Sequence, residues 1–285
     1  ICESLALIHG NWHGKISKSI AASSGLFDIS KKNWINSLTM FPNVKFPEVC
    51  EEKDNIYGDI KIENKNVPIY GCIGDLQASY FSIEMNDKSI NINLGTGSQV
   101  SKMYFEGDEK LFEVRPMFNE DYFTTVSHIP CGRVLDIYSN FFNKIANVSN
   151  ENKNIFWDMF FSKSVTSKKN LLNIDLSIFK GSYNYKSGGL ISNIREDNMD
   201  PEVFVDSIKH SFVAQYLKVI KNMQDHSEIK FDNIILTGAL ASKISIFCEL
   251  ISSQLKIKTK IVNHDYDATL IGLSKLSESI YNNLD

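Results

Sequence analysis

The chain has 285 residues, of which 43% are hydrophobic and 22% charged. This composition is that of an ordinary globular protein with one large core or two smaller ones, and it excludes a disordered or fibrous chain. The formal net charge of -4 provides no basic excess for binding nucleic acid or an anionic membrane surface, so neither is an expected partner.

The five cysteines lie far apart, without a CxxC pair or a histidine cluster. Their odd number and wide spacing argue against a disulfide framework and against a zinc site. The longest apolar runs fall short of the roughly 20 residues that a membrane-spanning helix needs. These features together favour a cytoplasmic protein.

The first 85 residues show helical patterns and few strands. The sequence opens at Ile1 in what is typical of the middle of an amphipathic helix, and we therefore expect a truncated or processed chain. The pattern predicts a helix that ends at Gly14, a turn at 24–28, a helix at 31–38, a polar hairpin at 58–67 and an apolar strand at 67–73.

The pattern changes at Ser89, where Ile90, Ile92 and Leu94 alternate with asparagines. This alternation predicts a strand, followed by a turn at 95–97 and a second strand at 99–105. Later segments are predicted as a strand at 122–129, helices at 134–145 and 201–223, a strand at 234–236, a turn at 238–241, a helix at 244–255, a strand at 259–262 and a helix at 268–284, with a polar surface excursion at 163–173.

The element order predicts a mixed-sheet α/β domain over residues 86–285. Residues 1–85 have too few strands for a sheet of their own, and we interpret them as the end of a preceding domain.

Two small-residue turns are candidates for binding an anion or a nucleotide. In Gly95-Thr96-Gly97-Ser98, successive backbone N–H groups and hydroxyls could converge on a phosphate, although the segment could also be a plain hairpin turn. Residues 236–242 form a strand end, a small turn and a helix start, where nucleotides approach the backbone closely. Alone, this second segment is equally an ordinary strand-to-helix connection.

Asp75 lies between an apolar strand and an apolar helix, where burying a carboxylate would be costly without a function or a partner. The alternative is a helix N-cap, worth about 1 kcal/mol. The sequence around Asp75 leaves both interpretations open.

The order of these segments resembles that in the FGGY carbohydrate kinases, which share the ribonuclease-H-like fold of actin. That family has Gly-Asp-x-Gln-Ala at the end of its first lobe and an Asn-x-x-x-Gly-Thr hairpin opening the second. The matching segments here are Gly74-Asp75-Leu76-Gln77-Ala78, Asn91 to Thr96, a glycine after the third strand at Gly132, a turn at Thr237 to Ala241, and Ala21 to Asp28 followed by Trp34. Within the family, the motif Gly-Asp-Leu-Gln-Ala-Ser is most similar to that of sedoheptulokinase.

The resemblance implies an α/β chain with the ribonuclease-H-like (actin-like ATPase) fold, comprising the C-terminal lobe plus the end of the N-terminal lobe. Residues 1–85 would be the remnant of the sugar-binding lobe, and residues 86–285 the nucleotide-binding lobe. The implied activity is transfer of a phosphoryl group from ATP, with Mg²⁺, to a hydroxyl of a ketose such as sedoheptulose.

The resemblance also implies roles for single residues. Asp75 would contact the sugar, accept its hydroxyl proton as general base and steer the waters of Mg²⁺. The β- and γ-phosphates would lie at Gly95, Thr96, Gly97 and Ser98, with Gly132 allowing their close approach, and the adenosine would border Gly238, Ala239, Leu240 and Lys243.

Two departures from the family pattern limit these expectations. Leu76 stands where some relatives have a polar residue that holds substrate hydroxyls. No Asp-x-Gly-Thr hairpin precedes Ile1, although the family uses it as its first phosphate loop and as a Mg²⁺ site. We therefore expect the 285-residue chain alone to be inactive and the full-length parent to be the kinase.

Two further alternatives stay open. A non-catalytic nucleotide-binding or interaction module could share this fold, because a fold does not fix a function. Asp75 argues against that alternative, since a pure binding module has no use for a base beside a phosphate loop. The sequence also leaves open whether the protein is a monomer or a homodimer.

Overall fold

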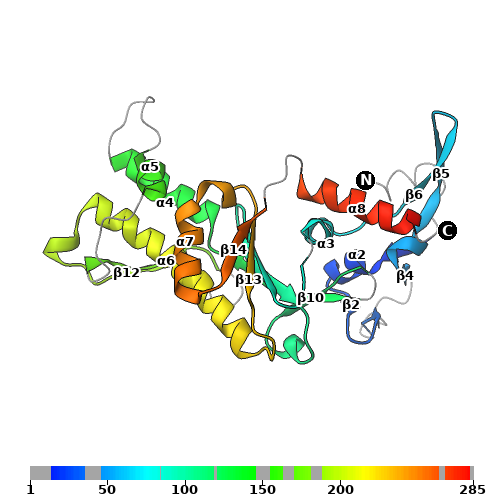
Figure 1. The fold of residues 1–285 in the computed structure, drawn as a ribbon, viewed down its shortest axis with the longest axis horizontal. Helices are drawn as coiled ribbons and strands as arrows, with labels where there is room; N and C mark the ends of the chain where they lie inside the picture. Colours follow the sequence, from blue (N-terminus) through cyan, green and yellow to red (C-terminus); the bar gives the residue numbers. More distant parts are fainter. Residues whose placement is uncertain are drawn as a thin grey trace. The chain divides into compact units, whose positions relative to one another are not determined.

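The computed structural model describes residues 14–35, 46–83, 85–118, 121–145, 155–162, 170–180, 188–262 and 267–282. The chain divides into two compact units (Figure 1). The first comprises Ile1–Glu84, Val114–Phe123 and His264–Asp285, and the second comprises Met85–Glu113 and Thr124–Asn263. The prediction assigned all residues from 86 onward to one domain. The last helix is instead part of the first unit, for reasons of helix packing given below.

The first unit begins with short strands rather than with two long helices. Its elements up to residue 50 are β1 (Lys15–Ser17), α2 (Lys18–Ser23), β2 (Phe27–Asp28), β3 (Asn33–Trp34) and β4 (Glu48–Cys50). The helix predicted over 31–38 is wrong at residues 31–35, which form a turn and β3. The rest of that segment, and the helix predicted before Gly14, lie outside the described residues.

A side chain explains why residues 28–34 turn back instead of continuing as a helix. Asp28 Oδ1 accepts hydrogen bonds from the amides of Ser30 and Lys31, both at 3.1 Å. Lys32 has a φ of 50°, which a right-handed helix excludes. The chain reversal pairs β2 with β3 and places the rings of Phe27 and Trp34 edge to face, 5.6 Å apart. Local hydrogen bonding by aspartate thus overrides helix propensity here.

The predicted polar hairpin is present as β5 (Ile56–Ile62) and β6 (Lys65–Tyr70), which pair antiparallel. Its two-residue loop has positive φ at both Glu63 (48°) and Asn64 (66°), as the hairpin turn with matching twist requires. The strand predicted at 67–73 ends earlier, at Tyr70. Residues 71–74 are irregular and lead into α3 (Asp75–Ser82).

Helix α8 (Ala268–Asn282) packs closely against α3, which is why the last helix joins the first unit. Gly272 makes this approach possible, because a Cβ there would lie 1.7 Å from the carbonyl oxygen of Ala78. Ser79 and Thr269 are hydrogen-bonded through their hydroxyls at 3.1 Å, and Lys275 Nζ donates to the carbonyl of Ser82 at 3.0 Å. The C-terminal half of α3 is therefore tied to α8.

A six-stranded sheet has the strand order β14-β13-β7-β8-β10-β9, and the second unit contains all of it except most of β9 and the first two residues of β10. Strand β7 pairs antiparallel with β8 and parallel with β13, which in turn pairs parallel with β14. The strands are β7 (Ser89–Leu94), β8 (Ser98–Met103), β9 (Glu113–Pro116), β10 (Tyr122–Ile129), β13 (Asn233–Thr237) and β14 (Lys258–Ile261). The mixed sheet and its predicted strands are confirmed, with small shifts of their ends.

Helices bury the apolar side chains of this sheet; Figure 1 shows α6 and α7 beside β13 and β14. The helices of the unit are α4 (Gly132–Ile145), α5 (Ile155–Phe161), α6 (Pro201–Asp225) and α7 (Ser245–Leu255). A small hairpin consists of β11 (Asn173–Asp175) and β12 (Leu190–Ser192). Short 3-10 turns lie at Asp108–Lys110 (η3), Glu196–Asn198 (η5) and Ala241–Lys243 (η6). Among the described helices, none is long and apolar enough to cross a membrane.

Local signals in the sequence fix where α6 begins. Asp200 caps the helix by accepting hydrogen bonds from the amides of Glu202 and Val203, and Pro201 occupies the first helical position as predicted.

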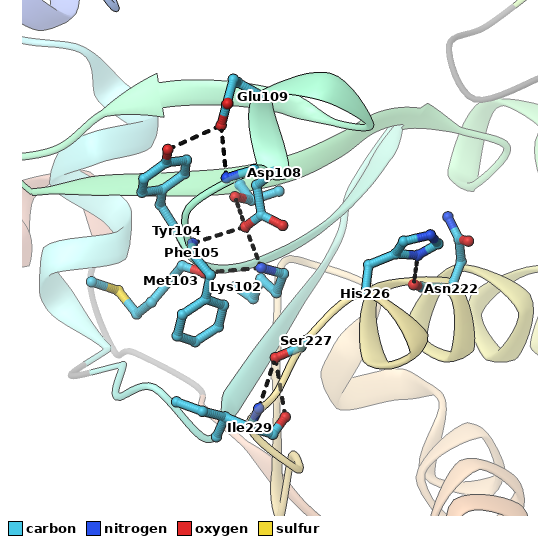
Figure 2. Close-up of polar contacts among 12 residues, drawn as sticks. Lys102, Met103, Tyr104, Phe105, Asp108, Glu109, Asn222, His226, Ser227 and Ile229 are labelled. Carbon is cyan, nitrogen blue, oxygen red and sulfur yellow. Dashed lines mark hydrogen bonds and ion pairs between the residues drawn. The ribbon is translucent and has the colours of Figure 1, made fainter.

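A buried ion pair braces the end of β8 (Figure 2). Asp108 of η3 accepts from Lys102 Nζ, from the amide of Phe105 at 2.9 Å and from the hydroxyl of Thr124 at 2.7 Å. Burial lowers the pKa of Lys102, while Asp108 acts in the opposite direction. Removing either partner would leave a buried charge uncompensated, so the pair fixes how the chain leaves β8.

Glu52, in a 3-10 turn at Glu52–Asp54 (η2) of the first unit, is a buried carboxyl whose Oε1 has no hydrogen-bond partner among the described residues. Burial raises its pKa from 4.5 to about 7; Glu51 adds to the rise, and Lys18 opposes it. The folded protein therefore holds a proton on Glu52 at pH values where the unfolded chain releases it.

This raised pKa makes the stability of the first unit depend on pH. Because the folded-state pKa exceeds the unfolded value, the contribution is complete below pH 4.5 and is lost as the pH rises to about 7. At about 1.4 kcal/mol per pKa unit, the loss amounts to about 3 kcal/mol. We expect Glu52→Gln to remove this decline in denaturant unfolding measured between about pH 4 and 8. Glu48→Gln, at an exposed site, is the control, and identical slopes for wild type and Glu52→Gln would contradict the assignment.

Candidate functional site

Three backbone segments meet where β7 ends. The amide of Gly132, at the start of α4, donates to the carbonyl of Gly95 at 3.1 Å, and the next amide, that of Arg133, donates to Thr96 at 2.9 Å. From the other side, the amide of Leu240 donates to the carbonyl of Leu94 at 3.1 Å. The hairpin turn, the start of α4 and the turn after β13 are thus held together by main-chain hydrogen bonds.

Glycine is required at two of these contacts. A Cβ on Gly132 would lie 2.8 Å from the carbonyl oxygen of Gly95. A Cβ on Gly238, whose φ is 95°, would lie 2.5 Å from the carbonyl oxygen of Leu94. Any larger residue at either position would push the segments apart, because the contacted atoms belong to the backbone.

The hairpin turn presents backbone donors. The amide of Gly95 donates to the carbonyl of Gly97 at 3.2 Å. In the part of the chain that the structure describes, the amides of Thr96 and Gly97 donate to no backbone carbonyl. Both residues are exposed, so these N–H groups can bind an anion.

A pocket of about 540 Å³ opens beside this turn, which is within the usual size range of small-molecule sites. Many of the predicted binding residues line it: Gly95, Thr96, Gly132, Ala239, Leu240 and Lys243. The structure therefore brings together both small-residue turns that the sequence singled out, although they lie in distant parts of the chain. Lys243 supplies a positive charge to the lining.

The pocket has a wall that the sequence analysis missed. Asp136 of α4 and three residues of α5 complete the lining: Trp157, Asp158 and Phe161. The signal for α5 was present in Ile-Phe-Trp-Asp-Met-Phe-Phe, where two aromatic pairs recur at i and i+4. Because α5 has only seven residues, its pattern is too short to predict a helix from periodicity.

The predicted residues outside the pocket lining support the turn. Ser98 begins β8, and its buried hydroxyl donates to the carbonyl of Asn93 at 2.6 Å, across the turn. Gly97 is exposed at the tip of the turn. Gly238 packs against the backbone carbonyl of Leu94. Asn91 is buried and donates through Nδ2 to the carbonyl of Ile235 at 3.2 Å, which ties β7 to β13.

Asp75 belongs to the first unit, where it is the first residue of α3. Its side chain is exposed, so the burial argument made from the sequence is wrong. The N-cap position is occupied by Gly74, and Asp75 Oδ1 accepts from the amide of Leu76 at 2.7 Å. The carboxylate therefore lies at the N-terminal end of α3.

A second cavity, of about 550 Å³, lies in the second unit between the β11–β12 hairpin and α6, and it is bordered by Gln254 of α7. None of the predicted site residues lines it. The two cavities are therefore similar in size. They differ in that the glycine-containing turns converge only on the first one.

No protein-family model matches the sequence, and no curated protein matches it either. Solved structures do match. The ligand-bound xylulose kinase and the gluconate kinase from Lactobacillus acidophilus each superpose with a TM-score of 0.72 at 13% identity, over 95% of this chain and 56% of theirs. The glycerol kinase of Plasmodium falciparum with ADP gives 0.67 at 14% identity, over 90% of this chain and 53% of its own.

The chain has the fold of these sugar kinases. The predicted α/β fold of the actin-like ATPase class is thereby confirmed. The chain spans about half the length of the solved structures that it matches. At these identities the likeness concerns the fold, and the activity has to be argued from the site.

The contact between Gly132 and Gly95 predicts the outcome of a matched pair of substitutions. Gly132→Ala places a methyl group 2.8 Å from a backbone oxygen and should lower the free energy of unfolding by about 1–3 kcal/mol. Gly97→Ala is the control, because its Cβ meets nothing within 4 Å and its φ is not left-handed. Denaturant unfolding measures both variants, and equal stability would show that α4 starts further from the turn.

Proposed function

We propose that the full-length parent of this chain is a carbohydrate kinase of the FGGY type, which transfers a phosphoryl group from ATP to a hydroxyl of a sugar. The observation that carries the proposal is the convergence of the Gly95–Gly97 turn, the start of α4 at Gly132 and the turn at Gly238–Leu240 around one pocket. Unpaired amides, small residues and a helix start are the means by which proteins bind phosphate groups.

The fold supports this proposal. The matched structures include a xylulose kinase, a gluconate kinase and a glycerol kinase with ADP. In the proposed complex, the phosphates of ATP lie at the Gly95–Gly97 turn and at Gly132, and the adenosine lies toward Ala239, Leu240 and Lys243. Lys243 adds a positive charge that would offset part of the charge of the triphosphate.

Mg²⁺ is proposed to accompany the ATP. The described residues contain no group of three or more histidine, cysteine or acidic side chains that could hold a metal ion. This fits Mg²⁺, which is usually held by substrate phosphates, waters and one or two carboxylates. Asp75 is the carboxylate that we assign to its waters. When bound, the ion would neutralise charge on the transferred phosphoryl group.

Asp75 is proposed to accept the proton of the sugar hydroxyl as general base. Its exposed carboxylate is accessible to a substrate, and its place at the start of α3 fixes the backbone that carries it. A hydroxyl that loses its proton as it attacks phosphorus becomes a better nucleophile. The rest of the rate enhancement would come from positioning, as is usual in phosphoryl transfer.

A ketose such as sedoheptulose is the proposed acceptor. This finer assignment rests on the motif Gly-Asp-Leu-Gln-Ala-Ser around Asp75. The test is a coupled assay of the full-length parent with ATP, Mg²⁺ and a panel of ketoses, aldoses and glycerol. We expect ADP release with ketoses. Turnover of glycerol alone would contradict the ketose assignment, and nucleotide binding without turnover of any sugar would favour the non-catalytic module.

The role of Asp75 predicts a selective loss in Asp75→Asn. In the full-length parent, we expect sugar phosphorylation to fall by about 10²–10⁴-fold, because the base is lost. The affinity for ATP should stay within a few-fold, and the amide oxygen of the introduced asparagine can still accept from Leu76. Steady-state kinetics and ATP titration measure the two effects. Asp59→Asn, which changes an exposed carboxylate on β5, is the control, and an Asp75→Asn variant that keeps most of its kcat would show that Asp75 is structural only.

A further inference from the structure

Helix α5 presents two different aromatic faces. Phe156 and Phe160 are fully buried and stack on each other with ring centroids 5.6 Å apart. Trp157 and Phe161 are a second stacked pair, with centroids 5.5 Å apart and planes inclined by 21°, and both line the pocket. The first pair fixes the helix to the core, and the second, stacked pair lines the pocket as an aromatic wall.

A buried lysine holds the end of this helix in place. Lys209 of α6 is 1% exposed, and its Nζ donates to the carbonyls of Met159 at 3.3 Å and Ser162 at 2.9 Å. The same Nζ pairs with Asp206 at 3.0 Å. Carbonyls at a helix end lack partners within the helix, and here a buried cation satisfies them. The aromatic wall is therefore held in position rather than left to adapt.

The lining of the pocket combines groups of different charge and chemistry. The turn at Gly95 and Thr96 offers backbone donors to an anion. Helix α5 offers two ring systems with the carboxylate of Asp158 between them in sequence, and Asp136 of α4 adds a second carboxylate to the lining. A polyphosphate would be repelled by these carboxylates. A planar heterocycle would gain from stacking, and its N–H groups could donate to Asp158.

We propose that α5 is the base-recognition wall of this pocket, with Trp157 stacking on the nucleobase, Phe161 extending the ring surface and Asp158 accepting from an amino group of the base. This inference rests on the proposed nucleotide site and assigns its specificity to a helix that carries none of the predicted residues. Lys209 is the positioning residue of the wall, since it acts on the ligand only through α5.

The experiment measures binding of ATP to the protein by calorimetry and by tryptophan fluorescence. Stacking on a base contributes about 1–3 kcal/mol, so Trp157→Ala should weaken ATP binding by at least about 5-fold. Tripolyphosphate, which has no base, should bind Trp157→Ala as it binds the wild type. Trp157→Phe keeps a ring and should retain ATP affinity within a few-fold, while the fluorescence response to ATP disappears.

A matched control is Phe141→Ala, which removes an exposed aromatic ring from α4 outside the pocket lining and should change neither affinity. A fluorescence response to ATP that persists in Trp157→Phe overturns the proposal, and this readout does not depend on the folding of Trp157→Ala. Unchanged ATP affinity in Trp157→Ala overturns it as well, with the nucleotide site intact. A wild-type protein that binds neither ATP nor tripolyphosphate would instead overturn the proposed function.

Discussion

The close approach of three backbone segments at the end of β7 is the constraint on which the rest of the site depends. The start of α4 and the turn after β13 both contact the hairpin turn through main-chain hydrogen bonds, and Gly132 and Gly238 leave room for them. Because the contacts are between backbones, no rearrangement of side chains could accommodate a larger residue. The pocket beside the turn exists because this junction fixes the positions of α4 and the turn at Gly238–Leu240.

Buried ion pairs hold the elements that surround this junction. Lys102 and Asp108 fix the end of β8 away from the turn, and Lys209 with Asp206 holds the end of α5. Each cation also satisfies backbone carbonyls or shares its carboxylate with other donors, which offsets the cost of burying charge. Such pairs contribute less to net stability than to a single defined arrangement. A pocket with a rigid aromatic wall needs that arrangement.

In the first unit, a close helix-to-helix contact fixes the helix that carries Asp75. Helix α3, which begins at Asp75, is packed against α8 at a distance that only glycine at position 272 permits. Two polar contacts in the C-terminal half of α3 add to this packing. The carboxylate is thus exposed on a helix that is packed closely against α8, as its proposed role as general base would require.

The mixed sheet, the helices α4, α6 and α7 and the two small-residue turns of the pocket could be predicted from the amino-acid sequence, whereas β9, α5, β11 and β12 were missed. The predicted features follow from local rules: alternation in β7, a proline and aspartate at the start of α6, and glycines where the chain turns. Features that depend on distant contacts emerged only in the folded chain. Helix α8 joined the first unit because Gly272 lies against Ala78, which is far away in the sequence. Asp28 stopped a predicted helix by binding nearby amides. The α5 wall could not be predicted, since seven residues carry too little periodicity and the partner that fixes it, Lys209, lies in another helix.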